Sequence, residues 1–405
     1  MTVRKVLLIK YGEISLRKGN RALFEQGLMN SIRRRIKEVS PKSVKVTREQ
    51  GRFLIEDIEG DIDSNALLPR IRHLFGITGF CRAIKTTSRD IDTIREIALE
   101  FFSHHVSGAS SFRVETKRSD KRFPLTSNET SAAIGDYIWK SDLGLKVDLH
   151  KPDRTLWVEI RNDVYLYVNS ESGEGGLPYG SSGKGVLLLS GGFDSPVAGY
   201  LTARRGVEIV PIYFHSPPFV SERAHDKVVD LAQQLAKYTG RIKLFTVPFT
   251  DVQLFLKDET PPEKLTIMLK RAMLHIGGKL AEKESAHCLI TGDAIGQVAS
   301  QTLHSLAAVN SAAPLPILRP LAALDKQHII DIAARIGTEE ISVRPYDDCC
   351  TLFVAKHPEN KPHTGAIERL ESKIFAKLLP LLDAALESSY YTICHGCLQP
   401  ADYAV

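Results

Sequence analysis

The alternation of apolar and polar positions divides the first 170 residues into two small α+β units. The first, residues 1–62, begins with an apolar strand and continues into a helix whose apolar residues recur at the spacing of one helical face. The second, residues 63–170, again combines short strands with a helix. The predicted strands are 3–9, 43–46, 53–55, 79–86, 112–116, 155–160 and 164–168, and the predicted helices are 21–37 and 91–102.

The pattern changes after residues 171–184, a segment rich in Gly, Ser and Pro that predicts a linker. From 185 to 405 strands and longer helices alternate, and residues 186–189 are apolar without interruption, which is typical of a parallel strand buried on both faces. The predicted strands are 186–189, 207–214, 242–247 and 287–292, and the predicted helices are 195–206, 221–240 and 263–283. This order predicts a doubly wound parallel-sheet α/β domain.

Composition indicates a globular chain without a membrane segment. Its 405 residues are 43% hydrophobic, and no apolar run approaches the roughly 20 residues that a membrane span requires. The first residues, MTVRKVLLIKYGE, lack the long apolar region and cleavage site of a signal peptide. We therefore expect a cytoplasmic protein with no membrane partner. Its six cysteines are too few for a disulfide scaffold, and we expect them to be reduced.

Positive charge is concentrated in the N-terminal part of the chain. The net charge is only +5, but residues 1–60 carry 14 Lys and Arg against 7 Asp and Glu. Within the second unit, five basic side chains fall within ten residues: Arg113, Lys117, Arg118, Lys121 and Arg122. Such a cluster favours contact with a polyanion, although a solvated loop is the alternative.

A short loop with the sequence SGGFDS, residues 190–195, connects the strand at 186–189 to the next helix. A buried strand, a glycine-rich turn and a helix start direct backbone N–H groups and the positive end of the helix dipole at one point, which suits a phosphate group. We expect Ser195 to cap this helix and Pro196 to open its first turn. The loop matches neither GxxxxGK[ST] nor GxGxxG, so it predicts neither a standard P-loop nor a Rossmann dinucleotide site.

The loop resembles the SGGxDS pyrophosphate loop of the PP-loop ATP pyrophosphatases, and further segments narrow the resemblance. YFHSPPFVSERA, KRAM, TGDAIGQVASQTL and LPILRPL are similar to segments of the tRNA 4-thiouridine synthetases, the ThiI family of tRNA sulfurtransferases. KYGEISLRKGNRALFE resembles the ferredoxin-like start of that family, and the basic middle unit resembles its RNA-binding THUMP domain. The resemblance implies a ferredoxin-like domain at 1–62, a THUMP domain at 63–170 and a PP-loop domain at 185–405.

The resemblance also implies a set of ATP-binding residues. Asp194 would help to hold Mg²⁺ or the pyrophosphate, and Arg271 would contact the triphosphate, with the adjacent Lys270 as its rival. The basic cluster would contact tRNA. The implied ATP-binding residues are Leu188, Leu189, Ser190, Gly191, Gly192, Asp194, Ser195, Tyr213, Phe214, Arg271, Gly292 and Gln301.

Two pairs of cysteines are candidates for sulfur chemistry. The resemblance places the catalytic, persulfide-carrying cysteine in PYDDCCTLF, at Cys349 or, one position later, Cys350. With no room for the rhodanese domain of many relatives, we expect a cysteine desulfurase to load this cysteine directly. Cys394 and Cys397 have CxxC spacing, which suits a redox disulfide, half of a metal site or part of an iron–sulfur cluster. The alternative is that this pair has no catalytic role.

The expected reaction is the ATP-dependent formation of 4-thiouridine at position 8 of tRNA. Uridine O4 is a poor leaving group, so its adenylation precedes its displacement by sulfur. The persulfide either attacks C4 directly or delivers hydrosulfide after a second thiol reduces it. The alternatives are thiolation of another tRNA base, sulfur transfer to the ThiS carrier protein in thiamine synthesis, and a non-catalytic THUMP RNA-binding protein. A homodimer is expected if one protomer cannot reach from the RNA-binding unit to the ATP site on the same tRNA.

Overall fold

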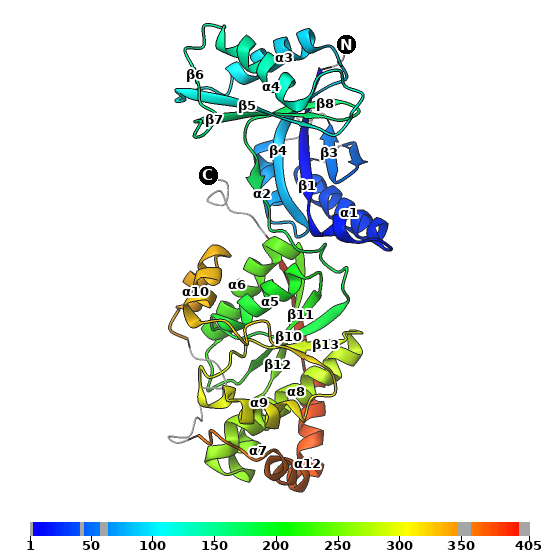
Figure 1. Ribbon diagram of the computed structural model, residues 1–405. Coiled ribbons are helices and arrows are strands. Elements are labelled where there is room, and N and C mark those ends of the chain that lie inside the picture. The colour runs from blue at the N-terminus through cyan, green and yellow to red at the C-terminus, as the bar shows by residue number, and fades with distance from the viewer. Residues whose placement is uncertain (1–2, 41–43, 57–63, 347–357, 397–405) are drawn as a thin grey trace. The chain divides into compact units, whose positions relative to one another are not determined.

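The computed structural model describes residues 3–40, 44–56, 64–346 and 358–396. Contacts between Cα atoms divide the chain into an N-terminal unit that ends at Gly176 and a C-terminal unit that starts at Leu177 (Figure 1). Along the described parts of the chain, none of the helices combines the length and the apolar character that crossing a bilayer requires.

The described part of the N-terminal unit forms one nine-stranded sheet, in the order β2-β3-β1-β4-β8-β7-β5-β6, with β9 paired to β4. Its strands are β1 (Val3–Tyr11), β2 (Val46–Glu49), β3 (Arg52–Glu56), β4 (Ile77–Thr86), β5 (Ser111–Arg118), β6 (Lys146–Val147), β7 (Arg154–Ile160), β8 (Val164–Tyr167) and β9 (Glu171–Ser172). Its helices are α1 (Arg21–Val39), α2 (Ser64–Arg72), α3 (Ile91–Ser103) and α4 (Ser127–Trp139), with a 3₁₀ turn η1 (Glu13–Leu16).

Strand β4 connects the two halves of this sheet. It is antiparallel to β1, with Leu8 opposite Cys81, and antiparallel to β8, with Ile84 opposite Leu166. The predicted domain boundary at residue 62 therefore assigns β4 to the second domain, although the longest pairing of β4 is with β1 of the first domain. The segment predicted to be a linker, residues 171–184, also lies partly in the sheet, because its first two residues form β9, which pairs with β4.

Two of the elements that differ from the sequence expectation have a clear physical reason. The strand expected at 43–46 is instead β2, at Val46–Glu49, because the pairing with β3 starts only at Val46. Helix α4 was not expected from apolar spacing. Its signal is a capping box, in which the Thr126 hydroxyl accepts from the Glu129 N–H while the Glu129 carboxylate accepts from the Thr126 N–H.

The C-terminal unit confirms the doubly wound prediction. Its described strands form a six-stranded sheet in the order β14-β13-β10-β11-β12-β15, parallel except for β15. The strands are β10 (Lys184–Leu188), β11 (Glu208–His215), β12 (Arg241–Pro248), β13 (Cys288–Ile290), β14 (Ile317–Leu318) and β15 (Tyr390–His395). The helices are α5 (Asp194–Arg204), α6 (Glu222–Thr239), α7 (Thr250–Glu259), α8 (Leu265–Lys283), α9 (Leu303–Asn310), α10 (Lys326–Arg335), α11 (Glu339–Ser342) and α12 (Thr364–Glu387), with 3₁₀ turns η2 (Pro262–Lys264) and η3 (Ala299–Gln301).

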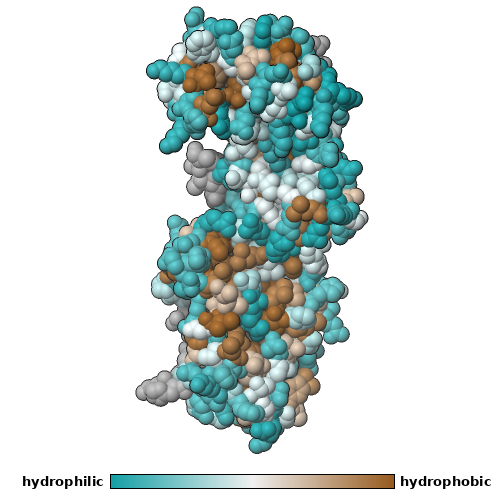
Figure 2. Space-filling model, in the orientation of Figure 1, coloured by the Kyte–Doolittle hydropathy of each residue, from teal (hydrophilic) through white to brown (hydrophobic). Residues whose placement is uncertain are grey.

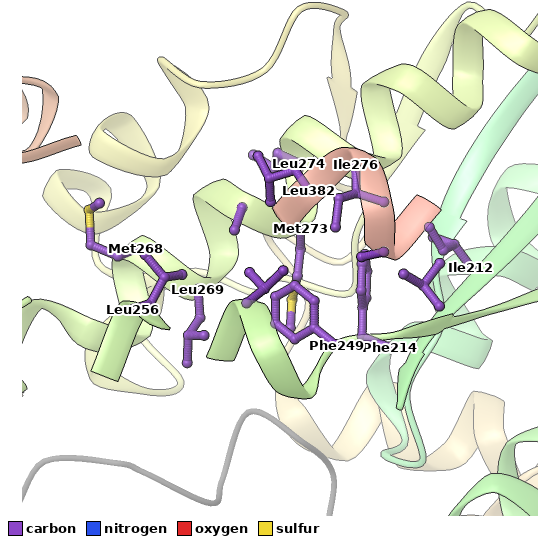
Figure 3. Close-up of a cluster of buried hydrophobic side chains, with 14 of the residues drawn as sticks. Ile212, Phe214, Phe249, Leu256, Met268, Leu269, Met273, Leu274, Ile276 and Leu382 are labelled. Atoms are coloured by element: carbon purple, nitrogen blue, oxygen red, sulfur yellow. The ribbon is translucent and has the colours of Figure 1, made fainter. Parts of the chain in front are cut away.

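Alternate residues of the central strands pack on opposite faces of this sheet. Leu187 of β10 contacts the face of α5 at Gly199, where an added Cβ would lie 2.6 Å from the leucine. Val186, the preceding residue, belongs instead to the core beneath α8. Figure 3 shows part of that core, where Met273 of α8 lies close to Phe249. Phe249 meets Phe214 of β11 edge to face, with ring centroids 5.0 Å apart. This packing fixes the carboxyl end of β11 against α8.

Candidate nucleotide-binding site

A cavity lies where β10, β11 and β13 end. The chain proceeds from β10 to β11 on one side and later returns to β13 on the other, so this is the topological switch point at which doubly wound sheets bind ligands. The lining residues are Leu188, Leu189, Ser190, Asp194, Ser195, Tyr213, Phe214, Lys270, Met273, Leu274, Thr291, Gly292, Asp293, Gln301, Val309 and Arg319.

Nine of the twelve residues expected to bind ATP line this cavity, and all twelve are described. The nine are Leu188, Leu189, Ser190, Asp194, Ser195, Tyr213, Phe214, Gly292 and Gln301. Gly191 and Gly192 lie in the adjoining loop, whereas the side chain of Arg271 points elsewhere, as described below. One part of the wall is apolar, with Met273, Leu274 and Val309, and another carries charged groups. This combination suits a nucleotide, which has a flat base and an anionic phosphate chain.

Hydrogen bonds from Ser195 close the loop at 190–195. The backbone N–H of Ser190 donates to the Ser195 hydroxyl at 2.8 Å, and that hydroxyl donates to the Ser190 carbonyl at 3.2 Å. The prediction that Ser195 caps the helix is wrong. Helix α5 begins one residue earlier, its N-cap is Phe193, and no side chain caps it. The hydroxyl therefore shapes the loop and leaves the helix start to an anion.

Gly292 lies against the start of α5. A Cβ at this position would lie 2.7 Å from the backbone N of Ser195 and 3.0 Å from the Cβ of Asp194. Such contacts are not tolerated by packed atoms, so only glycine lets the end of β13 approach the loop this closely. The expected close approach at Gly292 is thus present in the structure.

Asp194 is paired with Lys326, the first residue of α10. The ammonium of Lys326 lies 2.7 Å from an Asp194 carboxylate oxygen and 5.6 Å from the centre of the Phe193 ring. Phe193, the variable position of the motif, thereby offers its ring face to a cation at the cavity. The sequence analysis missed Lys326, because nothing in its local pattern distinguishes it from other lysines.

A second charged group surrounds Asp293. Its carboxylate lies 2.9 Å from the Lys270 ammonium and 3.5 Å from Arg319 Nε, and it accepts a hydrogen bond from the Thr291 hydroxyl at 2.8 Å. Burial alone would raise the pKa of Asp293, but the charge and hydrogen bond of Lys270 hold it below its ordinary value. Asp293, Lys270 and Arg319 lie in the motifs TGDAIGQVASQTL, KRAM and LPILRPL, but the sequence alone predicts no role for Asp293 or Arg319.

Arg271 is buried away from the cavity. Its guanidinium forms a bidentate pair with Glu371 of α12, with Nε 3.0 Å from the carboxylate, and also donates to the Ala308 carbonyl and the Ser311 hydroxyl. Only 2% of its side chain is exposed. Of the two neighbours on α8, the structure brings Lys270 to the cavity, and it gives Arg271 a structural partner.

The basic cluster of the N-terminal unit contains two kinds of residue. The lysines are exposed, whereas the arginines form hydrogen bonds or ion pairs with other residues of the unit. Lys117 and Lys121 are exposed, and neither is ion-paired with a described residue. Arg118 donates to the carbonyls of Phe123 and Leu125, both at 3.1 Å. Arg113 pairs with Glu115 at 2.9 Å, and Arg122 pairs with Asp120 at 3.0 Å although most of its side chain is exposed. Of this cluster, the two lysines are therefore the residues whose charge is most available to an external anion.

Three of the four candidate cysteines, Cys349, Cys350 and Cys397, lie outside the described residues. Cys394 lies in β15, opposite Ile242, and is buried. Burial raises the pKa of its thiol to about 11, whereas metal ligands and redox-active cysteines have depressed pKa values. Within the described ranges no group of three or more His, Cys, Asp and Glu could hold a metal ion. A redox or metal role for Cys394 and Cys397 stays a prediction, because the other cysteines of that site lie outside the described residues.

Family models match along nearly the whole chain. They are the ThiI ferredoxin-like domain over 6–81, the THUMP domain over 88–169 and the thiamine biosynthesis protein ThiI over 180–376. A probable tRNA sulfurtransferase of Thermoanaerobacter pseudethanolicus is 46% identical over 92% of this chain and 96% of its own length. One from Lachnoclostridium phytofermentans is 44% identical over 95% and 98%.

A solved structure gives the same result. The crystal structure of a 4-thiouridine synthetase–RNA complex with bound ATP superimposes with a TM-score of 0.87 at 36% identity, covering 97% of this chain and 100% of that one. The predicted combination of ferredoxin-like, THUMP and parallel-sheet PP-loop segments is confirmed. The chain belongs to the ThiI family of tRNA sulfurtransferases.

Proposed function

We propose that this protein is an ATP-dependent tRNA sulfurtransferase that makes 4-thiouridine. The observation that carries the proposal is the convergence of nine expected ATP-binding residues on one cavity of the PP-loop domain. Kinship to a 4-thiouridine synthetase solved with RNA and ATP supports it. It accounts for both parts of the chain, because a nucleotide site alone cannot select an RNA.

The charged and apolar parts of the cavity orient ATP. The base packs among the apolar residues near Tyr213 and Phe214, and the phosphates face the loop at 190–195, Lys270 and Lys326. Mg²⁺ binds proteins through one or two carboxylates together with substrate phosphates, and Asp194 is the carboxylate placed to take part. When bound, Mg²⁺ neutralises charge on the pyrophosphate. Lys270, held by Asp293, contributes a fixed positive charge.

In the proposed reaction, uridine O4 attacks the α-phosphorus of ATP. The new O4–P bond forms, the P–O bond to pyrophosphate breaks, and the proton on N3 is released, which leaves an adenylated base. Sulfur from a persulfide on Cys349 or Cys350 then bonds to C4 while AMP departs. A second thiol reduces the persulfide sulfur–sulfur bond before or after this step, and the resulting disulfide requires an external reductant.

The remaining partners follow from this chemistry. A cysteine desulfurase supplies the persulfide, and Lys117 and Lys121 contact phosphates of the tRNA, whose uridine 8 is the target. A homodimer would let one protomer hold the RNA while another modifies it. Sulfur transfer to the ThiS carrier protein is a second candidate function, favoured by the ThiI model named for thiamine biosynthesis.

Reconstitution tests the proposal. The protein, ATP, Mg²⁺, cysteine, a desulfurase and unmodified tRNA are incubated, and 4-thiouridine is measured by its absorbance and by nucleoside mass spectrometry. We expect product with the wild type and none with Asp194→Ala. Loss is also expected with Cys349→Ala or Cys350→Ala, while Cys288→Ala serves as the matched control. Undiminished product in both single cysteine variants and in the double variant would refute the persulfide route.

A further inference from the structure

A second hollow adjoins the nucleotide cavity in the C-terminal unit. The two share Asp194, Lys270 and Gln301 as a common wall. Beyond this wall the second hollow is lined by residues of α8, of the segment before and within η3, and of the chain just before α12. We call it the acceptor hollow and define it by Ile267, Gln297, Val298 and Glu359, together with the shared wall.

The charges around the acceptor hollow argue against a phosphate group inside it. Lys270 lies on the shared wall and Lys326 beside it, whereas the far side carries the carboxylates of Glu263 and Glu359. A phosphate chain is stabilised near the lysines and the loop at 190–195, and it is repelled by the two carboxylates. The hollow is therefore suited to an uncharged group that lies next to the nucleotide cavity, across the shared wall.

Unpaired polar atoms give the hollow a hydrogen-bonding specificity. Gln297 Nε2, Gln301 Oε1 and Glu359 Oε2 are buried and have no hydrogen-bond partner among the described residues. Two of the three backbones are held in place: the Gln301 N–H donates to the Val298 carbonyl at 2.9 Å, and the Glu359 N–H donates to the Glu263 carbonyl at 3.0 Å. Buried polar atoms are normally satisfied, so a group of three in one hollow indicates a ligand that supplies the missing partners.

Part of the wall around these atoms is apolar. Ile267 and Val298 line the hollow, and 55% of Val298 is exposed. Other exposed apolar residues of the same chain segment are Ile295 and Leu303, and Figure 2 shows apolar surface over the middle of the C-terminal unit. Flat bases that leave a helical stack are bound in such places, between apolar surfaces and with their edges hydrogen-bonded.

We infer that the acceptor hollow binds the unstacked uracil base of the substrate RNA, with Gln297 as a specificity-determining residue. The base edge carries one donor, N3–H, between two acceptors, O2 and O4. The amide Nε2 of Gln297 supplies a donor for a carbonyl, and Gln301 Oε1 and Glu359 Oε2 supply acceptors for N3–H. A base held there presents O4 toward Lys270 and Asp194. The inference rests on the proposed function and adds to it the place and the partners of the acceptor base.

Matched substitutions test the inference. Gln297→Met keeps the length of the side chain and removes its amide, and Gln233→Met is the control, because Gln233 is exposed on α6. With full-length protein and tRNA, we expect Gln297→Met to lower kcat/KM for tRNA thiolation on the order of 10- to 100-fold, the effect of one lost buried hydrogen bond. The KM for ATP should change less than about twofold, because the nucleotide cavity does not contain this amide. The affinity for tRNA should also change less than about twofold, because most of it comes from phosphate contacts outside the hollow.

A binding measurement separates this inference from the proposed function. A tRNA that keeps uridine 8 and carries 2-aminopurine at position 9 reports the unstacking of uridine 8 by its fluorescence, without any thiolation. We expect wild type and Gln233→Met to raise the fluorescence, and Gln297→Met to raise it less. Normal thiolation and normal fluorescence by Gln297→Met would overturn the assignment of the hollow while the proposed function stands. A wild type that does not thiolate tRNA refutes the proposed function. The fluorescence of wild type against Gln297→Met then tests by itself whether the hollow binds the base.

Discussion

Lys270 and Arg271 are consecutive residues of α8 with separate partners: Lys270 is paired with Asp293 at the nucleotide cavity, and Arg271 is buried against Glu371 of α12. Lys270→Ala should raise the KM for ATP about 10- to 100-fold, because it removes a positive charge facing the phosphates. It should cost less stability than Arg271→Ala, because Asp293 keeps Arg319 and Thr291 as partners. Arg271→Ala should lower the free energy of unfolding by about 3–5 kcal/mol, since it removes both guanidinium bonds and leaves Glu371 buried with only His275 as a partner. Urea unfolding and ATP kinetics measure both. A stable Arg271→Ala enzyme with impaired ATP affinity would reverse the assignment of the two residues.

Gly292→Ala should abolish ATP binding or weaken it at least tenfold. The added methyl would lie 2.7 Å from Ser195 N, so the start of α5 or the end of β13 must move. Calorimetric titration with a non-hydrolysable ATP analogue measures the effect.

Gly277→Ala is the matched control. A Cβ at Gly277 meets Leu289 at an ordinary 3.5 Å, and alanine is a better helix former than glycine by about 1 kcal/mol. We expect unchanged ATP affinity and equal or higher stability. Equal ATP affinity in both variants would contradict the close approach at Gly292.

Replacing Lys117 and Lys121 together by alanine should weaken tRNA binding and flatten its salt dependence. Each phosphate contact contributes about one unit to the slope of log K against log salt, so the slope should fall by up to about two. Filter binding at several salt concentrations measures it. The control is the double change of Lys361 and Lys373, exposed lysines of the C-terminal unit; if both double variants keep the wild-type slope, these lysines do not contact the RNA.

The Arg271–Glu371 pair should make stability depend on pH in the acidic range. Burial by itself would raise the pKa of Glu371, but hydrogen bonds from His275 and Arg271 lower it from an ordinary 4.5 to about 2. A carboxyl whose pKa is lower in the folded state stabilises the fold above about pH 4.5, and this contribution declines as the pH falls toward 2. Urea unfolding of the wild type between about pH 5.5 and pH 3 should show a steeper loss than Glu371→Gln; identical slopes would contradict the pair.

Cys394 should be unreactive in the native protein. Because its thiol is buried with a pKa of about 11, little thiolate forms at pH 8, and iodoacetamide should label it far more slowly than in the denatured chain. Peptide mapping identifies the labelled cysteine. Cys394→Ala should retain thiolation of tRNA, and a loss comparable to that of Asp194→Ala would support the redox or metal interpretation.

The sequence by itself was sufficient for the fold class and for the phosphate-binding loop, because both depend on interactions close along the chain. An uninterrupted apolar strand, a glycine-rich turn and a helix start are neighbours in sequence, and the backbone geometry that joins them follows from residues 186–205 alone. The family resemblance carried by the motifs around Tyr213, Gly292 and Gln301 added part of the remaining cavity wall, but not Met273, Asp293 or Arg319.

The tertiary structure decided which side chains carry charge into the site. Apolar periodicity cannot tell whether Lys270 or Arg271 lines the cavity, since the answer depends on Glu371, a hundred residues later, which neutralises Arg271 in the core. Lys326 reaches Asp194 across 132 positions of sequence, and β4 joins two predicted domains into one sheet. These pairings are invisible to local pattern because they exist only once burial has brought distant segments together and made each unpaired charge unfavourable.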